Sequence, residues 1–257
     1  MKKHLLNFVT MFAFLFCLPA FANTAPYSTD FSTDPGWVTD QPSNYYQDTA
    51  SQTYHVQPEH QYPGYTPSRY AYKLLPDAVG SFELQWDTIL TRCDWSISIP
   101  FGIYDSSLTR YAIDPDPLGQ YVLGLAGNPD AGHLWALIVS GADGYAEYPG
   151  GGTWNFDTWY ACKLSYNAST YMSSFEVWER ESGSSVWSAS VAVPGGFTND
   201  LMYLGSSSSG IGDDGQYRGI SPSAVAEGNI DNVQLVPEPA TLLLLGLGGL
   251  MLRKRSR

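Results

Sequence analysis

Short runs in which apolar and polar residues alternate recur along this chain of 257 residues and constrain its fold more than any other feature. Between Phe82 and Asp87, and again between Trp95 and Phe101, every second residue is large and apolar. Because successive side chains of a β-strand point to opposite faces, this period predicts strands with one buried face. Leu134–Val139 is apolar throughout, which predicts a central strand covered on both faces.

Similar patterns predict further strands, and no segment between the two ends of the chain has a convincing helical period. The 25 Gly and 17 Pro residues supply frequent turns, while 18 Tyr, 8 Trp and 11 Phe residues suit pleated surfaces. Residues 181–185 predict a hairpin loop between consecutive antiparallel strands. We therefore expect one all-β domain, a two-sheet antiparallel sandwich. The other predicted strands are Tyr121–Ala126, Trp159–Tyr166, Ser174–Arg180, Val186–Val193, Leu201–Gly205 and Asn229–Val236.

The first 22 residues have the layout of a secretory signal peptide. Two lysines precede an apolar run at residues 5–18, and Ala20 and Ala22 form a small-x-small cleavage site. The run is shorter than the roughly 20 residues that a membrane-spanning helix needs. We expect a signal helix over residues 1–22, cleavage after Ala22, and export of the remaining chain.

Two cysteines remain after the signal peptide is removed, Cys93 and Cys162. Outside the cytoplasm, such an even pair favours a disulfide over two separate buried thiols. We therefore expect a bridge between Cys93 and Cys162. In the chain-entropy model, closing this loop stabilises the fold by roughly 4 kcal/mol.

Residues 236–257 form a second targeting segment, made of a Pro-Glu-Pro element, an apolar stretch and a basic end. A helix over the apolar stretch at 240–252 is about 20 Å long. It is therefore a marginal anchor for a hydrocarbon core of roughly 30 Å. The positive-inside rule keeps the basic end in the cytoplasm and the acidic domain outside. The Pro-Glu-Pro element is Pro237, Glu238 and Pro239, and the stop-transfer residues are Arg253, Lys254, Arg255 and Arg257.

This order of features closely resembles the PEP-CTERM sorting tail of Gram-negative bacteria. The resemblance covers only the tail and implies recognition by an exosortase, a membrane-embedded cysteine transpeptidase that cleaves near Pro237, Glu238 and Pro239. Both prolines hold the peptide extended and remove backbone donors, which displays Glu238 at the membrane face. The alternative is a hinge before an ordinary anchor. The resemblance implies an inner-membrane-anchored precursor, which is then moved to the cell surface or released.

The last run of the domain, residues 228–235, resembles the final strand of concanavalin-like, laminin-G-like jelly rolls. This resemblance implies a jelly roll for the domain at residues 23–235. The charge of this domain limits the partners that it can bind. Six of the 13 basic residues lie in the end segments, whereas 24 of the 25 acidic residues lie between them. The domain therefore carries a net charge of about −17 by formal counting and should repel nucleic acid and anionic lipid.

Catalytic signatures are missing from the sequence of the domain. A glycoside hydrolase needs two carboxylates directed into one cleft. The nearest cluster, Glu176, Glu179 and Glu181, lacks the Glu-x-Asp-x-x-Glu arrangement of laminarinase-like jelly rolls and predicts a solvated strand end. The three histidines outside the signal peptide, at positions 55, 60 and 133, are not spaced as a zinc site. We therefore predict no catalytic residue.

Calcium is the more reasonable ion, because oxygen ligands in Gly-rich loops suit it. No candidate has the spacing of a defined calcium loop, and acidic turn residues commonly serve local hydrogen bonds instead. The calcium candidates are Asp114, Asp116, Asp213 and Asp214, with Asp130 as a further acidic turn residue.

Two functional hypotheses follow for the domain. The preferred one is a non-catalytic surface or matrix module that binds glycans, and the alternative is a polysaccharide-active enzyme, either a glycoside hydrolase or a lyase. Trp154, Trp159 and Tyr148 flank the loop at 149–152 and are candidates to stack on sugar rings, although most tryptophans should be core. The expected partners are the secretion translocon, an exosortase-type enzyme and extracellular polysaccharide.

Overall fold

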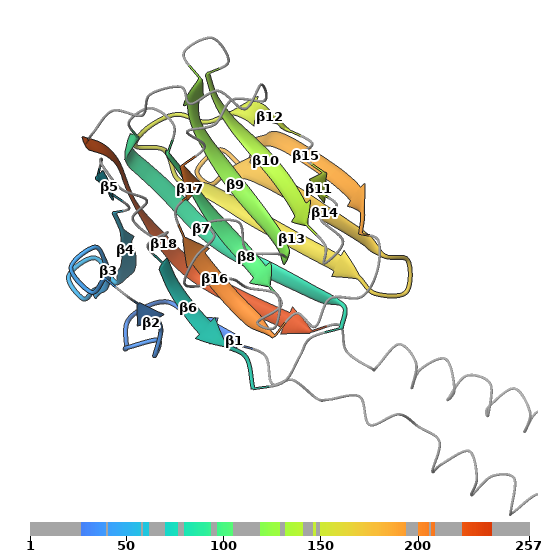
Figure 1. Cartoon of the computed structure of the whole chain (residues 1–257), viewed down its shortest axis with the longest axis horizontal. Coiled ribbons are helices and arrows are strands. Elements are labelled where there is room, and N and C mark those ends of the chain that lie inside the picture. The colour runs from blue at the N-terminus through green and yellow to red at the C-terminus, as the bar shows by residue number, and fades with distance from the viewer. Residues whose placement is uncertain are drawn as a thin grey trace, which may run out of the picture. The chain divides into compact units, whose positions relative to one another are not determined.

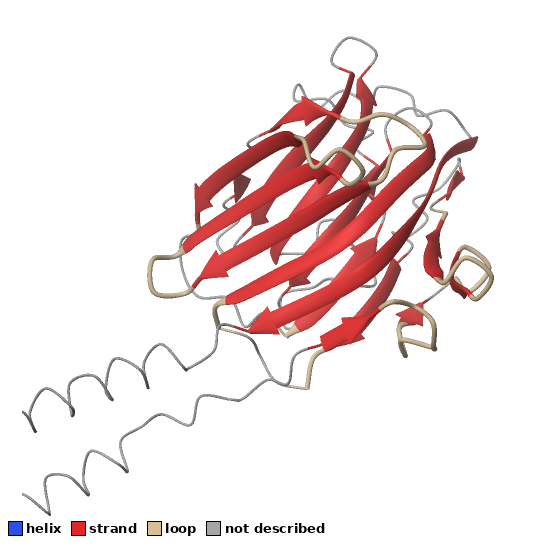
Figure 2. Cartoon of the chain, turned by 180° about the vertical axis from the view of Figure 1, so that it is seen from behind, coloured by secondary structure: helices blue, strands red, loops and turns tan. Residues whose placement is uncertain are grey.

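The structure is a computed structural model, and the residues that it describes all lie between Tyr27 and Pro237. In this part of the chain no helix has the length and apolarity needed to cross a membrane. Figure 2 shows that its regular elements are strands. The predicted signal helix and C-terminal helix lie outside the described residues. The structure describes residues 27–39, 41–57, 59–61, 70–76, 80–93, 97–104, 119–128, 132–140, 146–147, 150–193, 200–205, 207–208 and 223–237.

Two antiparallel sheets, each built from nine of the described strands, form a sandwich (Figure 1). Sheet A has the order β15 (Ser185–Ala192), β14 (Met172–Glu179), β13 (Tyr160–Asn167), β7 (Phe82–Cys93), β18 (Ser223–Pro237), β4 (Thr53–Val56) and β3 (Tyr45–Asp48), and β1 (Tyr27–Thr29) and β5 (Glu59–Gln61) also pair with β18. Sheet B has the order β11 (Ala146–Glu147), β10 (Gly132–Ser140), β9 (Gly119–Asn128), β8 (Ile97–Tyr104), β16 (Leu201–Gly205), β6 (Tyr70–Leu74) and β2 (Val38–Thr39), and β12 (Gly150–Thr153) and β17 (Ser207–Ser208) pair with β10 and β8.

An aromatic core joins the two sheets. Trp86 of sheet A meets Phe101 of sheet B edge to face, with ring centroids 4.9 Å apart. Phe175 of sheet A contacts Trp135 of sheet B at 5.9 Å. Such pairs add about 0.5–1.5 kcal/mol each beyond the burial of their apolar area. The sandwich is therefore held by interdigitated rings as well as by aliphatic side chains.

The predicted all-β sandwich is confirmed, and every strand predicted after residue 80 is present, although the short strands β11, β12 and β17 were not predicted. Phe82, Leu84 and Trp86 are all buried, as their alternation predicts. β13, β14 and β15 are consecutive antiparallel neighbours, joined in the last pair by the predicted loop. The six strands before residue 75 were not predicted, because their runs are short and interrupted by turn residues.

One strand has a different place from the one predicted. The run Leu134–Val139 forms most of β10, and its residues 135–137 are all buried, as expected for a strand covered on both faces. The predicted central position is wrong, because β10 has β9 on one side and only the short strands β11 and β12 on the other. Coverage of both faces thus arises near the end of the sheet.

The predicted disulfide between Cys93 and Cys162 is wrong. Cys162 is a free, buried thiol, and its strand partners are Trp86 on β7 and Val177 on β14. Cys93 lies on β7 seven residues beyond Trp86, which is about 23 Å along the strand at roughly 3.3 Å per residue. A disulfide requires Cα atoms within about 7 Å of each other. The register of β7 and β13 therefore excludes the bridge.

Candidate functional site

The outer face of sheet A, which is turned away from the core, carries polar side chains from neighbouring strands in aligned rows. Inward positions on these strands, such as Leu84 and Ile230, are buried, so their neighbours along the chain point outward. The register then defines which outward side chains adjoin. The rows are Tyr46, His55, Asn229 and Ile89; Asp231, Asp87, Ala161 and Trp178; Gln234, Gln85, Lys163 and Glu176; and Val236, Glu83, Ser165 and Ser174.

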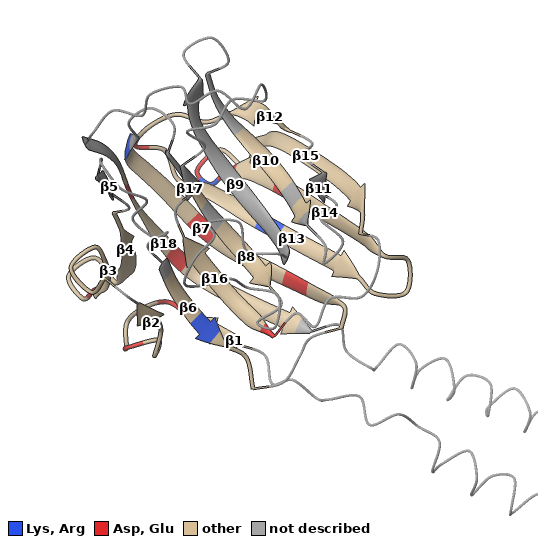
Figure 3. Cartoon of the chain, in the orientation of Figure 1, with Lys and Arg blue, Asp and Glu red and all other residues tan. Residues whose placement is uncertain are grey.

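Two half-buried tryptophans on this face each have a cationic side chain beside the ring. The Lys163 Nζ atom lies 5.4 Å from the ring centroid of Trp178, and the Arg180 guanidinium carbon lies 5.4 Å from that of Trp159. Lys163 also forms an ion pair with Glu176, with Nζ and Oε1 2.9 Å apart. Acidic residues outnumber basic ones on the described strands (Figure 3). Two of the few cations therefore lie beside aromatic rings on one face.

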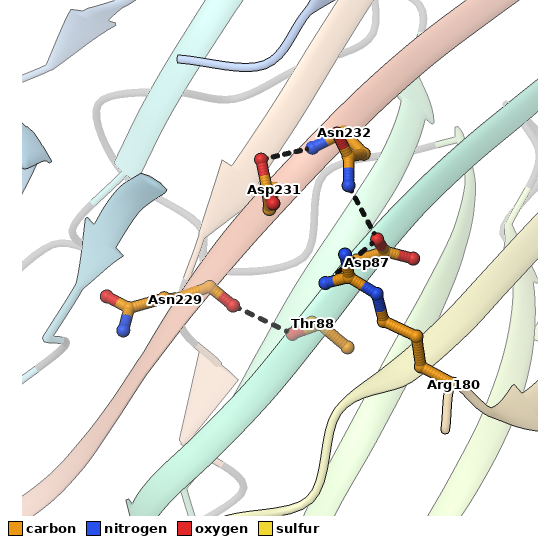
Figure 4. A network of polar contacts seen from close by, with 6 residues as sticks. All are labelled: Asp87, Thr88, Arg180, Asn229, Asp231 and Asn232. Atoms are coloured by element: carbon orange, nitrogen blue, oxygen red, sulfur yellow. Dashed lines mark hydrogen bonds and ion pairs between the residues drawn. The ribbon is translucent and has the colours of Figure 1, made fainter. Parts of the chain in front are cut away.

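Asp87 is the centre of a polar network on the same face (Figure 4). Its Oδ2 atom accepts a hydrogen bond from the Asn232 side-chain amide at 2.8 Å and pairs with the Arg180 Nη1 atom at 3.3 Å. The Asp87 side chain is only 14% exposed, whereas that of Arg180 is 42% exposed. The network therefore links β7, β18 and the end of β14 through one largely buried carboxylate.

A bulge in β18 positions Asn232. The register with β7 shifts between Asp231 and Gln234, and Asn232 adopts a left-handed backbone with φ 51°. Asn tolerates this conformation better than most residues because its short amide forms local hydrogen bonds. Its backbone N–H donates to Oδ1 of Asp231 at 2.7 Å. The bulge thereby directs the Asn232 amide across the strand toward Asp87.

Asp231 lies directly opposite Asp87, an arrangement of like charges that is unfavourable in a sheet. Partial burial raises the pKa of Asp231, and the charges of Asp87 and Asp30 raise it further. The Asn232 backbone N–H and the Arg180 charge oppose this increase. Hydrogen bonding to Ser32 instead lowers the pKa of the exposed Asp30 carboxyl. Three carboxylates thus share this region in different electrostatic surroundings.

A polar pocket of about 310 Å³ adjoins the network where β1 pairs with β18. It combines hydroxyl, carboxylate and amide groups, and its volume is at the lower end of the range for small-ligand sites. Asn232 contributes to both the pocket and the Asp87 network. The pocket is lined by Ser28, Thr29, Asp30, Thr33, Asn232 and Gln234.

Chemically, this surface offers hydrogen bonds in both directions together with flat aromatic rings. Carboxylates accept hydrogen bonds, hydroxyls donate and accept, and the amides of Asn232 and Gln234 do both. Among the described residues, no group of three or more His, Cys, Asp or Glu side chains is arranged to hold a metal ion. The described geometry therefore suits recognition of a polyhydroxylated ligand.

Comparison with known protein families addresses the C-terminal segment. Residues 235–256 match the PEP-CTERM protein-sorting motif. The chain carries a PEP-CTERM sorting motif. This confirms the resemblance inferred from its sequence and indicates an exported protein that is anchored at the membrane before processing. No curated protein matches the chain.

Comparison with solved structures shows the fold of the domain that precedes this motif. The exoplasmic/lumenal domain of VIP36, in a form bound to Ca²⁺ and Man3GlcNAc, is 11% identical with a TM-score of 0.52, covering 82% of this chain and 90% of that one. A β-glucanase of Bacillus licheniformis is 10% identical with a TM-score of 0.53, covering 83% and 99%. The domain is thus a concanavalin-like jelly roll, as its last strand suggested.

Most of the predicted targeting residues and all the predicted calcium residues lie outside the described structure. Of the sorting element, Pro237 is described, as the last residue of β18. This strand therefore continues two residues beyond Leu235, where the sequence predicted the end of the domain. The residues outside the described ranges are Ala20, Ala22, Asp114, Asp116, Asp130, Asp213, Asp214, Glu238, Pro239, Arg253, Lys254, Arg255 and Arg257.

The glutamates considered for catalysis occupy separate positions. Glu176 lies on the outer face and pairs with Lys163. Glu179 ends β14 and accepts a hydrogen bond from the Ser182 hydroxyl, and Glu181 lies in the exposed hairpin loop. The three side chains are therefore not directed together. Glu179 and Glu181 follow the prediction of a solvated strand end, while Glu176 belongs to the outer face of sheet A.

His55 and the Gly-rich loop make structural contacts. The His55 ring lies tilted against that of Tyr46, with centroids 4.8 Å apart, and contacts the Asn229 amide oxygen at 3.2 Å, while the side chains of His60 and His133 are not described. The predicted loop at 149–152 largely forms β12, whose glycines at 151 and 152 pack against Trp187. Trp154 is buried, whereas Trp159 lies on the outer face; Tyr148 is not described.

The sequence reasoning missed Asp87, Asn232, Lys163 and Arg180 as candidate site residues. Their grouping depends on the pairing of β7 with β18 and with β13, which are far apart in the chain, as well as on the hairpin of β13 and β14. One local signal was available, because adjacent Asp and Asn residues are depleted in strand interiors. Their occurrence in the last strand could have indicated the bulge at Asn232.

Proposed function

We propose that this protein is an exported, non-catalytic glycan-binding module that is sorted through its PEP-CTERM motif. In this proposal the outer face of sheet A binds the ligand, and the pocket between β1 and β18 receives one sugar unit. The tail serves an exosortase-type enzyme, which delivers the protein to the cell surface or releases it. Extracellular polysaccharide is the natural partner in that location.

The observation that carries the proposal is the combination of Trp178, the Asp87 network and the polar pocket on one continuous surface. The C–H face of a pyranose packs against an aromatic ring, and its hydroxyls pair with carboxylate and amide groups. Asp231, Asp87, Ala161 and Trp178 lie in one row over four neighbouring strands. That row spans about 14 Å at roughly 4.8 Å per strand step, which is comparable with a short oligosaccharide.

The decisive test is a glycan-array screen of the mature domain with and without calcium. The proposal predicts binding to at least one glycan, followed by loss of most of that binding in the Trp178→Ala and Asn232→Gly variants. Tyr171→Ala is the matched control, because Tyr171 is an exposed aromatic at the turn between β13 and β14. Binding that survives both site variants, or falls equally in the control, contradicts the assignment of this face.

The same purified domain tests the enzymatic alternative. The proposal predicts no depolymerisation of common β-glucans or galactans. Reproducible release of reducing ends, abolished by changing a single carboxylate, would replace the binding module with a hydrolase. Release of unsaturated products would replace it with a lyase.

A further inference from the structure

The sorting motif and the folded domain share residues. The motif match begins at Leu235, whereas β18 ends at Pro237. Leu235, Val236 and Pro237 therefore belong both to the segment that directs processing and to the last strand of sheet A. Any enzyme that acts on the motif must reach it next to a folded sheet.

These three residues are held within the sheet on the side of β7. Leu235, Val236 and Pro237 pair with Leu84, Glu83 and Phe82 in continuous antiparallel register. On the other side of β18, Leu235 pairs with Tyr27 of β1. Leu235 is fully buried in the core. Withdrawing it into an enzyme's active site would break pairing with two strands and expose a core side chain.

Pro237 marks the end of this pairing for a chemical reason. Proline has no backbone N–H and cannot donate to a strand ladder, so it is tolerated at strand ends and disfavoured within central strands. The first proline of the sorting element is therefore also the residue that terminates β18. Val236, which is 40% exposed, points outward beside Glu83.

We propose that the folded domain sets the N-terminal limit of processing, so that the bond cleaved lies on the C-terminal side of Pro237 and β18 remains whole in the mature protein. In this step one peptide C–N bond breaks. The acyl carbon ends bonded to the oxygen of water or to the nitrogen of an acceptor amine, and the tail leaves as a free amine that takes up the proton. The proposal does not depend on glycan binding, because it concerns β18 and the motif alone.

The first experiment determines the mature C-terminus by mass spectrometry, using protein from a host that carries the processing enzyme. The expected C-terminal residue is Pro237 or a later one, because each of these ends leaves β18 whole. A mature chain that ends before Pro237 overturns the proposal, as does a native chain that retains Arg257. Glycan binding by the same preparation reports separately on the proposed function.

The second experiment tests whether the sheet itself protects the segment. Full-length protein from a host without the enzyme is treated with a broad-specificity protease under native conditions, and its trimmed ends are identified by mass. Wild-type protein should give no end before Pro237. Because burial of Leu235 contributes at least one factor of ten in local opening, Leu235→Ser should open this segment about tenfold more often or more, and products ending before Pro237 should then appear.

Val236→Ser is the matched control, since it changes the same motif and strand at an outward position. It should leave the protected end unchanged. If Leu235→Ser fails to fold, the wild-type digestion alone still decides the question. Native ends before Pro237 in the wild type, or equal loss of protection in both variants, contradict a limit set by the sheet.

Discussion

Asn232 donates its side-chain amide hydrogen to Oδ2 of Asp87 across the pair of strands β18 and β7, with a separation of 2.8 Å. This contact depends on the left-handed backbone of Asn232, which sends the side chain across the strand. It also leaves the amide beside the polar pocket. The bulge therefore connects sheet structure to the candidate binding surface.

The first prediction separates the hydrogen bond from the backbone conformation. Asn232→Gly keeps the left-handed backbone without strain and removes the bond to Asp87, so it should destabilise the fold by about 0.5–1.5 kcal/mol. Asn232→Val adds a β-branched side chain at positive φ and should cost about 1–2 kcal/mol more. Urea denaturation measures both changes. Equal stability of the glycine and valine variants would contradict the strain assigned to this bulge.

The second prediction concerns Asp231, whose pKa is raised by burial and by neighbouring carboxylates. A carboxyl with a raised folded-state pKa binds more protons in the folded state than in the unfolded state, so its contribution to stability falls as pH rises from its unfolded value toward its folded value. Asp231→Asn removes that loss and retains an acceptor for Asn232. It should therefore melt above the wild type at pH 7.

The pH series supplies the control for this prediction. At pH 3, below the ordinary pKa of 3.8, the wild-type carboxyl is largely protonated and the difference between the two proteins should shrink. Comparing variant with wild type at each pH cancels the opposite contributions of Asp30 and Asp48, whose pKa values are lowered. A difference in melting temperature that stays constant from pH 3 to pH 7 would show that charge is not the cause.

Periodicity predicted the sandwich because the alternation of apolar and polar residues in each long strand shows by itself which face of the strand is buried. The alternation at Phe82, Leu84 and Trp86 requires no knowledge of partners. The N-terminal strands are too short to show such an alternation, since β1 and β2 contain only three and two residues. They are stabilised by pairing with β18 and β6, and a pairing between distant segments cannot be read from the local sequence.

The candidate site was less predictable for the same reason. Lys163 meets Glu176 through a hairpin and was within reach of local reasoning, whereas Asp87 meets Asn232 across 145 positions of sequence. The disulfide prediction failed because counting cysteines ignores register, which places Cys162 opposite Trp86. The sorting motif succeeded because its signal is the linear order of residues 237–257.

The third prediction is that Cys162 is an inert thiol. It is fully buried, and desolvation, together with the Asp87 charge, raises the pKa of its thiol well above the usual value. Only the thiolate reacts readily, so native protein should resist thiol labelling at Cys162, while urea-unfolded protein should be labelled. Reducing agent should leave the melting temperature unchanged. A large decrease on reduction would instead reveal a disulfide.

The fourth prediction tests the contact between β12 and β15. Gly152 has φ +61°, and an added Cβ would lie 2.5 Å from the Cβ of Trp187. Gly152→Ala should therefore destabilise the fold by at least about 1 kcal/mol, since left-handed strain alone contributes that much. Gly183→Ala is the control, because it has a similar φ of +67° and open space around its Cβ. Equal losses in thermal denaturation would leave only backbone strain and contradict the steric contact.

The last prediction defines the C-terminal edge of the domain by truncation. A chain ending at Pro237 keeps β18 whole, whereas a chain ending at Gln234 loses Leu235, which is fully buried and pairs with Leu84 and Tyr27. Burying a leucine contributes about 1.5–3 kcal/mol, and the lost pairing adds to this. In a domain of this size 1 kcal/mol shifts the melting temperature by roughly 2–4 °C. The shorter chain should therefore melt at least about 3–12 °C below the longer one.

A third chain, ending at Pro237 with Val236→Ser, removes an exposed apolar side chain from the same strand and should melt close to the longer one. Equal melting of the chains ending at Gln234 and Pro237 would show that Leu235 is not part of the core and that the domain ends before the sorting motif begins.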